Sequence, residues 1–168
     1  KILQPDTILI LLVIFLHISY NDSNSETSLN SERKESKIMK FITIGELLMR
    51  LSPPDYEKIR TTSSYVVNFG GAEANVAVSL ANLGVDTTVF TVLPDNDIGR
   101  SAVRSLKAND VHTSPIIFGG ERMGVYFLEE GIGVRSSKVI YDRKHSAFAE
   151  YDYTTVDFKA LLEGYDWL

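Results

Sequence analysis

The chain has 168 residues, 44% of them hydrophobic, which is enough for one modest domain with a core. It has no cysteine, which excludes disulfides and thiolate metal sites, and its three histidines show no metal-ligand spacing. The formal net charge is −5 without a basic run, so we expect no nucleic-acid partner.

The first 38 residues differ in composition from the rest. Residues 7–20 are almost continuously apolar, but this run is too short to span a bilayer as an ordinary helix. Residues 21–36 are rich in Ser, Asn and Glu and are typical of a disordered linker. We therefore interpret residues 1–38 as upstream translated sequence and expect the domain to begin at Met39, with no membrane partner and a cytoplasmic location. A targeting segment or membrane anchor is the alternative.

The first half of the domain has the signals of an α/β unit. Residues 40–45 form a short β-branched run that ends in glycine, which is typical of a buried strand. The β-prone run 65–69 leads through two glycines into an alanine-rich helix that ends before Gly84. Residues 85–93 have strand composition, so strand, helix and strand in this order predict a βαβ unit with parallel strands.

The pattern changes in the second half. Helical spacing covers residues 98–108, and afterwards short strand-like runs alternate with glycine-rich turns and no helix intervenes. These runs, which predict a small antiparallel or mixed sheet, are residues 116–118, 124–130 and 138–141. A short helix is expected over residues 154–162, and residues 165–168 would open the next core strand.

The glycine pair before the alanine-rich helix is the first candidate site. Gly70 and Gly71 carry no side chains, so a polar ligand can approach the backbone N–H groups at the positive end of the helix. Asn75, within the first turn, adds a side-chain amide. A tight turn that only lets the strand and helix pack is the alternative.

Four motifs in order resemble one family. The spacing Gly-Gly-x-x-x-Asn-x-Ala with a later Gly84 resembles the signature of the PfkB (ribokinase-like) carbohydrate kinases. Residues 45–54, 93–99 and 124–146 are similar to the branch that contains the 2-dehydro-3-deoxygluconate (KDG) kinases. The resemblance covers residues 39–168. It implies an α/β fold with a doubly wound core and a small β-sheet lid. The lid would consist mainly of residues 116–143 with part of 54–68, and the C-terminal half of the family's fold would be absent.

The resemblance also implies an activity. A KDG kinase phosphorylates a sugar acid with ATP and a divalent cation, which we expect to be Mg²⁺. A fructokinase or another PfkB sugar kinase is the nearest alternative. A truncated product that only binds a ligand or partner is an alternative of a different class. Lid sheets in this family often form dimer contacts, so a homo-oligomer through the lid is expected.

Five residues are implied to bind substrate, namely Gly71, Asn75, Tyr126, Tyr141 and Arg143. A guanidinium can bind a carboxylate with two parallel hydrogen bonds, which fits Arg143 as the partner of a sugar acid. Without the resemblance, the two tyrosines would be half-buried strand aromatics and Arg143 a charge on an edge strand.

Three neighbouring positions leave open questions. Asp142 stands where some relatives have tyrosine, and it would repel a carboxylate unless strand alternation points it away. Glu46 occupies a position where relatives have polar residues that contact the sugar. His145 follows Arg143 closely and is either part of the site or a surface residue.

The chemistry itself is expected elsewhere. In PfkB kinases an Asp in a Gly-x-Gly-Asp segment acts as general base, and helix N-terminal amides stabilise the transferred phosphoryl group. This segment does not occur in the sequence, nor does a P-loop. We therefore assign no catalytic residue and no metal ligand, expect the base beyond Leu168, and expect this chain alone to be inactive.

Overall fold

The computed structural model describes residues 39–168, which form one compact unit. The predictions for residues 1–38 lie outside the described residues. The strands are β1 (Lys40–Ile44), β2 (Leu48–Ser52), β3 (Val66–Gly70), β4 (Asp86–Phe90), β5 (Val92–Leu93), β6 (Ile117–Phe118), β7 (Val125–Glu129) and β8 (Lys138–Asp142). The helices are α2 (Ala72–Asn82), α3 (Asp97–Lys107), α4 (Ala147–Glu150) and α5 (Phe158–Leu162), with 3-10 turns η1 (Pro54–Tyr56) and η2 (Tyr153–Thr155).

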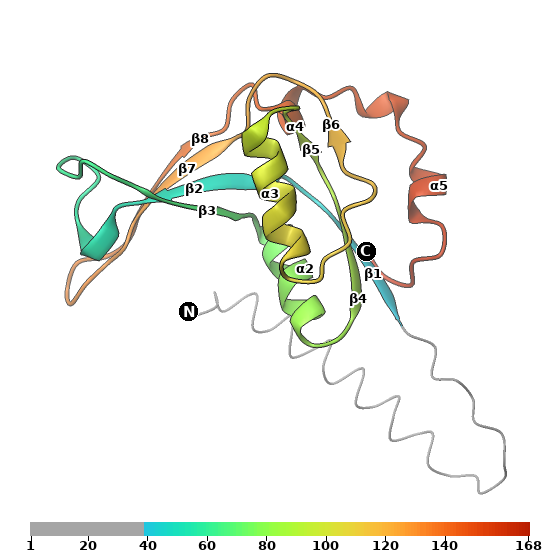
Figure 1. The fold of residues 1–168 in the computed structure, drawn as a ribbon, viewed down its shortest axis with the longest axis horizontal. Helices are drawn as coiled ribbons and strands as arrows, with labels where there is room; N and C mark the ends of the chain where they lie inside the picture. Colours follow the sequence, from blue (N-terminus) through green and yellow to red (C-terminus); the bar gives the residue numbers. More distant parts are fainter. Residues whose placement is uncertain (1–38) are drawn as a thin grey trace, which may run out of the picture. The chain divides into compact units, whose positions relative to one another are not determined.

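The core consists of parallel strands (Figure 1). β1 lies beside β4, with Lys40 opposite Asp86 at one end of the pair. Beyond β4, the backbone of His112 bonds to β4, and β6 pairs in parallel with β5. On the other side of β1, the Ile42 N–H donates to the Trp167 carbonyl at 3.1 Å. These short apolar strands are paired on both edges, as expected of a buried parallel sheet.

Helices cover both faces of this sheet, because successive strand residues point to opposite sides. Val89 packs into a buried cluster with residues of α2 and α3, including Ala77 and Leu106. The next residue, Phe90, faces the other way and makes an edge-to-face contact with Phe158 of α5, with ring centroids 6.2 Å apart. This arrangement confirms the predicted doubly wound α/β core.

A second sheet forms the lid, which extends to the left in Figure 1. Its strand order is β3-β2-β7-β8. The β2–β3 and β7–β8 pairs are antiparallel, whereas β2 and β7 are parallel. The lid is therefore a mixed sheet, one of the two forms that the sequence predicted.

Two strand assignments from the sequence are wrong. Residues 116–118 were expected in the lid, but β6 pairs with β5 in the core. The strand before α2, expected to be parallel to the strand after it, is β3 and lies antiparallel to β2 in the lid. The parallel partner of β4 is β1 instead. Both errors have the same cause, because strand composition does not specify which distant strand will be the neighbour.

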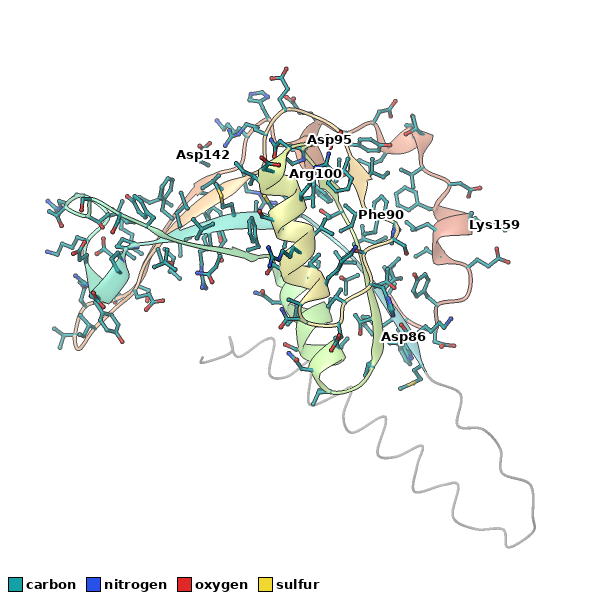
Figure 2. The ribbon with its side chains drawn as sticks, viewed as in Figure 1. Asp86, Phe90, Asp95, Arg100, Asp142 and Lys159 are labelled. Carbon is teal, nitrogen blue, oxygen red and sulfur yellow. The ribbon has the colours of Figure 1, made fainter. Side chains whose placement is uncertain are left out.

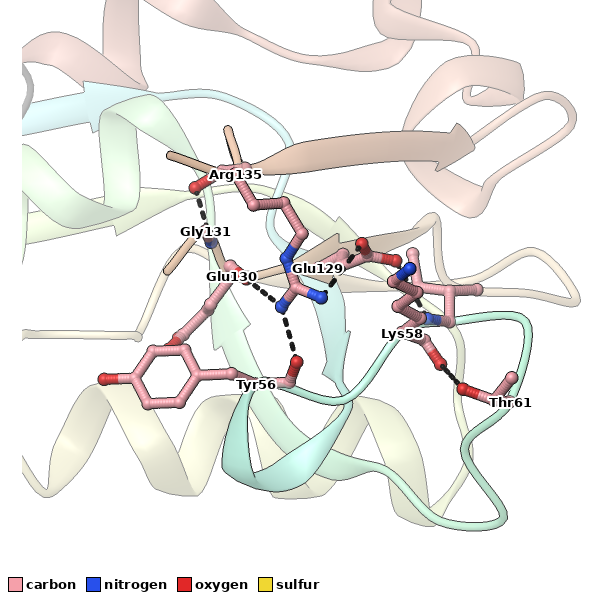
Figure 3. Close-up of polar contacts among 9 residues, drawn as sticks. Tyr56, Lys58, Thr61, Glu129, Glu130, Gly131 and Arg135 are labelled. Carbon is pink, nitrogen blue, oxygen red and sulfur yellow. Dashed lines mark hydrogen bonds and ion pairs between the residues drawn. The ribbon is translucent and has the colours of Figure 1, made fainter. Parts of the chain in front are cut away.

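The tip of the lid is held by one arginine (Figure 3). Arg135 donates to the carbonyl of Glu130 at 3.1 Å and to the carbonyl of Tyr56. Beside it, the Glu129 carboxylate accepts from the Ile59 N–H at 3.0 Å. These bonds tie the β7–β8 turn to the loop that follows β2.

The helix ends follow ordinary capping rules. Gly84 lies just after α2, where the sequence predicted the end of the helix, and its φ of +83° is the left-handed conformation usual at that position. Asn96 caps α3 by accepting from two backbone N–H groups, and Arg100 of the first turn pairs with Asp95 (Figure 2). The single helix expected over residues 154–162 is instead divided into η2 and α5, because Asp157 caps a new helix by accepting from Ala160.

No helix in residues 39–168 combines the length and the apolar character needed to cross a membrane.

Candidate functional site

The glycine pair lies where the lid meets the core. Gly70 ends β3 and Gly71 is the N-cap of α2. The backbone of Gly71 is extended, with φ −176° and ψ 159°, so its conformation is open to any residue. The constraint is space, because a Cβ here would lie 2.4 Å from the carbonyl oxygen of Glu46. Among the described residues no side chain caps the N-terminus of α2, so its first N–H groups face outward from the helix end.

Two predicted residues of the site, Asn75 and Tyr126, converge on Gly70. A Cβ at this position would lie 3.3 Å from Asn75 Oδ1 and 3.6 Å from the hydroxyl oxygen of Tyr126. Asn75 comes from α2 and Tyr126 from β7, so a helix of the core and a strand of the lid present polar atoms to one point. The missing side chain of Gly70 leaves that point open.

Tyr126 lies in a row of residues that crosses the lid. Strand register places Asn68 opposite Arg50, Arg50 opposite Tyr126, and Tyr126 opposite Tyr141. Opposed residues share a face of a sheet, so we call the side that carries these four residues the site face. The rings of Tyr126 and Tyr141 lie 5.8 Å apart between centroids. The structure thus brings both predicted tyrosines to one side of the lid.

Burial raises the pKa of Tyr126, and the charge and hydrogen bonding of Arg50 only partly oppose this shift. The phenol therefore stays protonated at neutral pH. In this form it can donate a hydrogen bond to a substrate oxygen as well as accept one.

Arg143 is held by a buried carboxylate. Its Nη2 lies 2.5 Å from Glu46 Oε2, and Ser146 Oγ donates to Glu46 Oε1 at 2.5 Å. The Glu46 side chain is 4% exposed, whereas that of Arg143 is 51% exposed. Gly124 makes room for the pair, because a Cβ there would lie 2.6 Å from Glu46 Oε1. Both oxygens of Glu46 are engaged, so its geometry favours positioning Arg143 over contacting a sugar.

Asp142 and His145 do not join this cluster. Asp142 pairs with Arg122 at 3.1 Å. It follows Tyr141 directly in β8, so the two side chains lie on opposite sides of the strand. It therefore does not oppose a carboxylate on the site face. His145 is exposed and pairs with Glu150, which fits the surface interpretation.

Sequence reasoning missed Arg50 and Ser146. A signal for Arg50 was present, because Leu48, Arg50 and Ser52 alternate along one strand and so share a face. No such signal existed for Ser146, whose bond to Glu46 joins residues 100 positions apart.

The pKa of Tyr153, which is affected by Glu46, predicts a pH effect on stability. Burial, with the nearby Glu46 and Tyr151, raises the pKa of Tyr153 to about 12, and its hydroxyl donates to the Phe148 carbonyl at 2.7 Å. The unfolded chain releases this proton near pH 10 and the folded chain only near pH 12, so this contribution to stability is complete below pH 10 and is lost between pH 10 and 12. Urea unfolding should show that the free energy of unfolding falls less steeply with pH in the Tyr153→Phe variant than in the parent across this interval. Parallel curves would contradict the assignment.

An α/β core with a mixed β-sheet lid and a polar site at their junction is the architecture of ribokinase-like sugar kinases, and solved structures of that class superimpose on it. The 2-dehydro-3-deoxygluconokinase of Thermotoga maritima is 47% identical, with a TM-score of 0.74 over 77% of this chain and 40% of that one. A putative 2-keto-3-deoxygluconate kinase from Enterococcus faecalis is 30% identical, with a TM-score of 0.73 over 76% of this chain and 38% of that one.

The family follows from the sequence match. The pfkB family carbohydrate kinase model matches residues 39–163, so the chain belongs to that family. Among curated proteins, the 2-dehydro-3-deoxygalactonokinase of Haloferax volcanii is 37% identical over 107 residues, which cover 64% of this chain and 34% of that protein. The chain thus spans about a third of the length of this curated relative.

Proposed function

We propose that the complete protein containing this chain transfers a phosphoryl group from ATP to 2-dehydro-3-deoxygluconate. The observation that carries this proposal is the convergence of Asn75 and Tyr126 on Gly70, with Arg143 two residues after the Tyr141 that lies opposite Tyr126. A neutral sugar needs hydroxyl partners only, whereas a sugar acid also needs a cation. The names of the relatives from T. maritima and H. volcanii support a sugar-acid substrate.

The proposed roles follow from chemistry and position. The N-terminal amides of α2 beside Gly71 and the Asn75 amide would bind sugar oxygens from the core side. Tyr126 and Tyr141 would do so from the lid. Arg143 is half exposed, so N–H groups that Glu46 does not use are open to the substrate carboxylate.

We propose no ATP site and no metal site among the described residues. No group of three or more His, Cys, Asp or Glu side chains in residues 39–168 could hold a metal ion. In this proposal the sites for ATP and Mg²⁺ and the general base belong to the rest of the complete protein. The experiments on activity below all use that protein.

A substrate panel tests the proposal. We expect kcat/KM for KDG to exceed that for fructose or ribose by at least about a hundredfold, because a site built around a cation leaves it unpaired with a neutral sugar. Equal or better turnover of fructose would contradict the proposal and favour a fructokinase. The galactonate epimer of KDG belongs in the panel, because the relative from H. volcanii is named for it.

We also propose a homo-oligomer through the lid. The side opposite the site face exposes apolar strand residues, among them Val67 and Ile140, and exposed apolar patches mark protein contacts. Sedimentation of the complete protein should show a dimer that Ile140→Lys dissociates, and a monomeric parent would contradict the idea. The cytoplasmic location stays a prediction.

A further inference from the structure

Arg50 occupies the centre of the site face. It lies on β2, a central strand of the lid, with Asn68 opposite it on β3 and Tyr126 opposite it on β7. Its side chain is half-buried. Because β2 has a neighbour on each side, the row of residues around Arg50 is fixed by backbone pairing and does not depend on a loop.

The guanidinium of Arg50 lacks an acidic partner within residues 39–168. Its Nε is buried without a hydrogen-bond partner among these residues, and the guanidinium is close enough to the Tyr126 hydroxyl to lower the pKa of that phenol against the stronger effect of burial. Other arginines of the lid and its margin, Arg122, Arg135 and Arg143, each have a carboxylate within 4.0 Å. Burying a cation without a counter-charge costs free energy. An anion should therefore bind more tightly beside Arg50 than beside an arginine that already has a carboxylate partner.

A second buried polar atom accompanies it on the same strand. Ser52 lies two residues after Arg50 and therefore on the same face. Its residue is 6% exposed, and its Oγ has no hydrogen-bond partner among the described residues. The site side of β2 thus carries two polar side chains whose hydrogen bonding is incomplete.

The charges around Tyr126 do not cancel. Arg143 contributes one positive charge and Glu46 one negative charge, and these two are paired. The exposed Glu73 of the first turn of α2 lies against Gly45, where a Cβ would be 2.4 Å from the Glu73 Cδ. Within residues 39–168, Arg50 is thus the arginine of this row that has no carboxylate partner.

We propose that Arg50 is a specificity-determining residue that binds the carboxylate of the sugar acid beside the Tyr126 hydroxyl, while Glu46 anchors Arg143. The inference rests on the proposed function, because it names the partner of the carboxylate in that site. It assigns the stronger share of carboxylate binding to the unpaired guanidinium. It also gives Tyr126 a second role, because its hydroxyl lies between Arg50 and the open position at Gly70 where the ligand would bind.

The test compares three variants of the complete protein. Arg50→Met removes the charge and keeps most of the chain volume, so KM for KDG should rise by about 10- to 100-fold, as expected for a hydrogen bond to a charged group. Turnover of fructose should change much less than turnover of KDG, because a neutral sugar has no carboxylate to lose its partner. Arg104→Met removes the same charge from an exposed position on α3 and should leave both substrates unchanged. Arg50→Gln is the deciding variant if Arg50→Met loses its cooperative thermal transition, because Gln keeps a donor for Tyr126.

A direct binding measurement separates this proposal from the proposed function. D-gluconate and its neutral counterpart D-glucitol would be titrated calorimetrically into the parent and the Arg50 variant. Loss of gluconate binding in a folded Arg50 variant supports the proposal even if KDG is not the best substrate. An unchanged KM for KDG, unchanged gluconate affinity, or a parent protein that does not prefer gluconate to glucitol would overturn it.

Discussion

Replacing Gly71 with alanine should destabilise the protein by about 3 kcal/mol and abolish sugar binding. The new Cβ would lie 2.4 Å from the Glu46 carbonyl oxygen, which is backbone and cannot rotate away. Either α2 or the turn between β1 and β2 must shift. Both shifts move groups of the site, because α2 carries Asn75 and the Glu46 side chain holds Arg143.

Urea unfolding and calorimetric titration with KDG would measure the two effects. Gly119→Ala is the matched control, since a Cβ there meets nothing within 4 Å and the backbone needs no left-handed conformation. It should be neutral or slightly stabilising, because alanine restricts the unfolded chain. If Gly71→Ala behaved like the control, the close approach of α2 to Glu46 would be wrong.

Replacing Arg143 with methionine should lower stability by about 2 kcal/mol and weaken KDG binding at least about tenfold. The Glu46 side chain is 4% exposed, so removing its cationic partner leaves a buried charge with Ser146 as its remaining hydrogen-bond donor. Adding Glu46→Gln removes that charge. The double variant should therefore recover much of the stability and none of the binding.

The double-mutant cycle separates the two roles of Arg143. Stability would be followed by thermal unfolding, and binding by titration with KDG. Arg122→Met is a useful comparison, because Arg122 also pairs with a carboxylate, but its partner Asp142 is exposed on the other side of β8. Additive effects of the Glu46 and Arg143 changes on stability would contradict their coupling.

Local chemistry made much of the fold predictable. Alanines at close-packed positions and Gly84 after the helix marked α2, and buried Ala74 and Ala77 occupy its inner face as the pattern indicates. Helical spacing marked α3 to within one residue at each end. Both signals depend on residues only a few positions apart.

Pairing across the chain was not predictable in this way. The run 116–118 looks like any other short strand, and only the neighbouring β5 edge makes it part of the core. Part of residues 54–68 was expected to join the lid, but the composition of the strand before α2 did not show that its antiparallel neighbour would be β2. A strand exposes donors and acceptors of the same kind on either edge, so its own residues do not select the partner.

The sequence was therefore sufficient for the α/β class, the presence of a small lid sheet and the family resemblance, whereas the substrate-binding roles of Gly71, Asn75, Tyr126, Tyr141 and Arg143 stay predictions. These follow from motifs and local periodicity. Only the tertiary structure showed that Glu46 engages Arg143 and Ser146, that Asp142 pairs with Arg122, and that Arg50 lies beside Tyr126 without a carboxylate partner among residues 39–168. The reason is physical, because whether a charge is compensated depends on side chains brought together from distant parts of the chain.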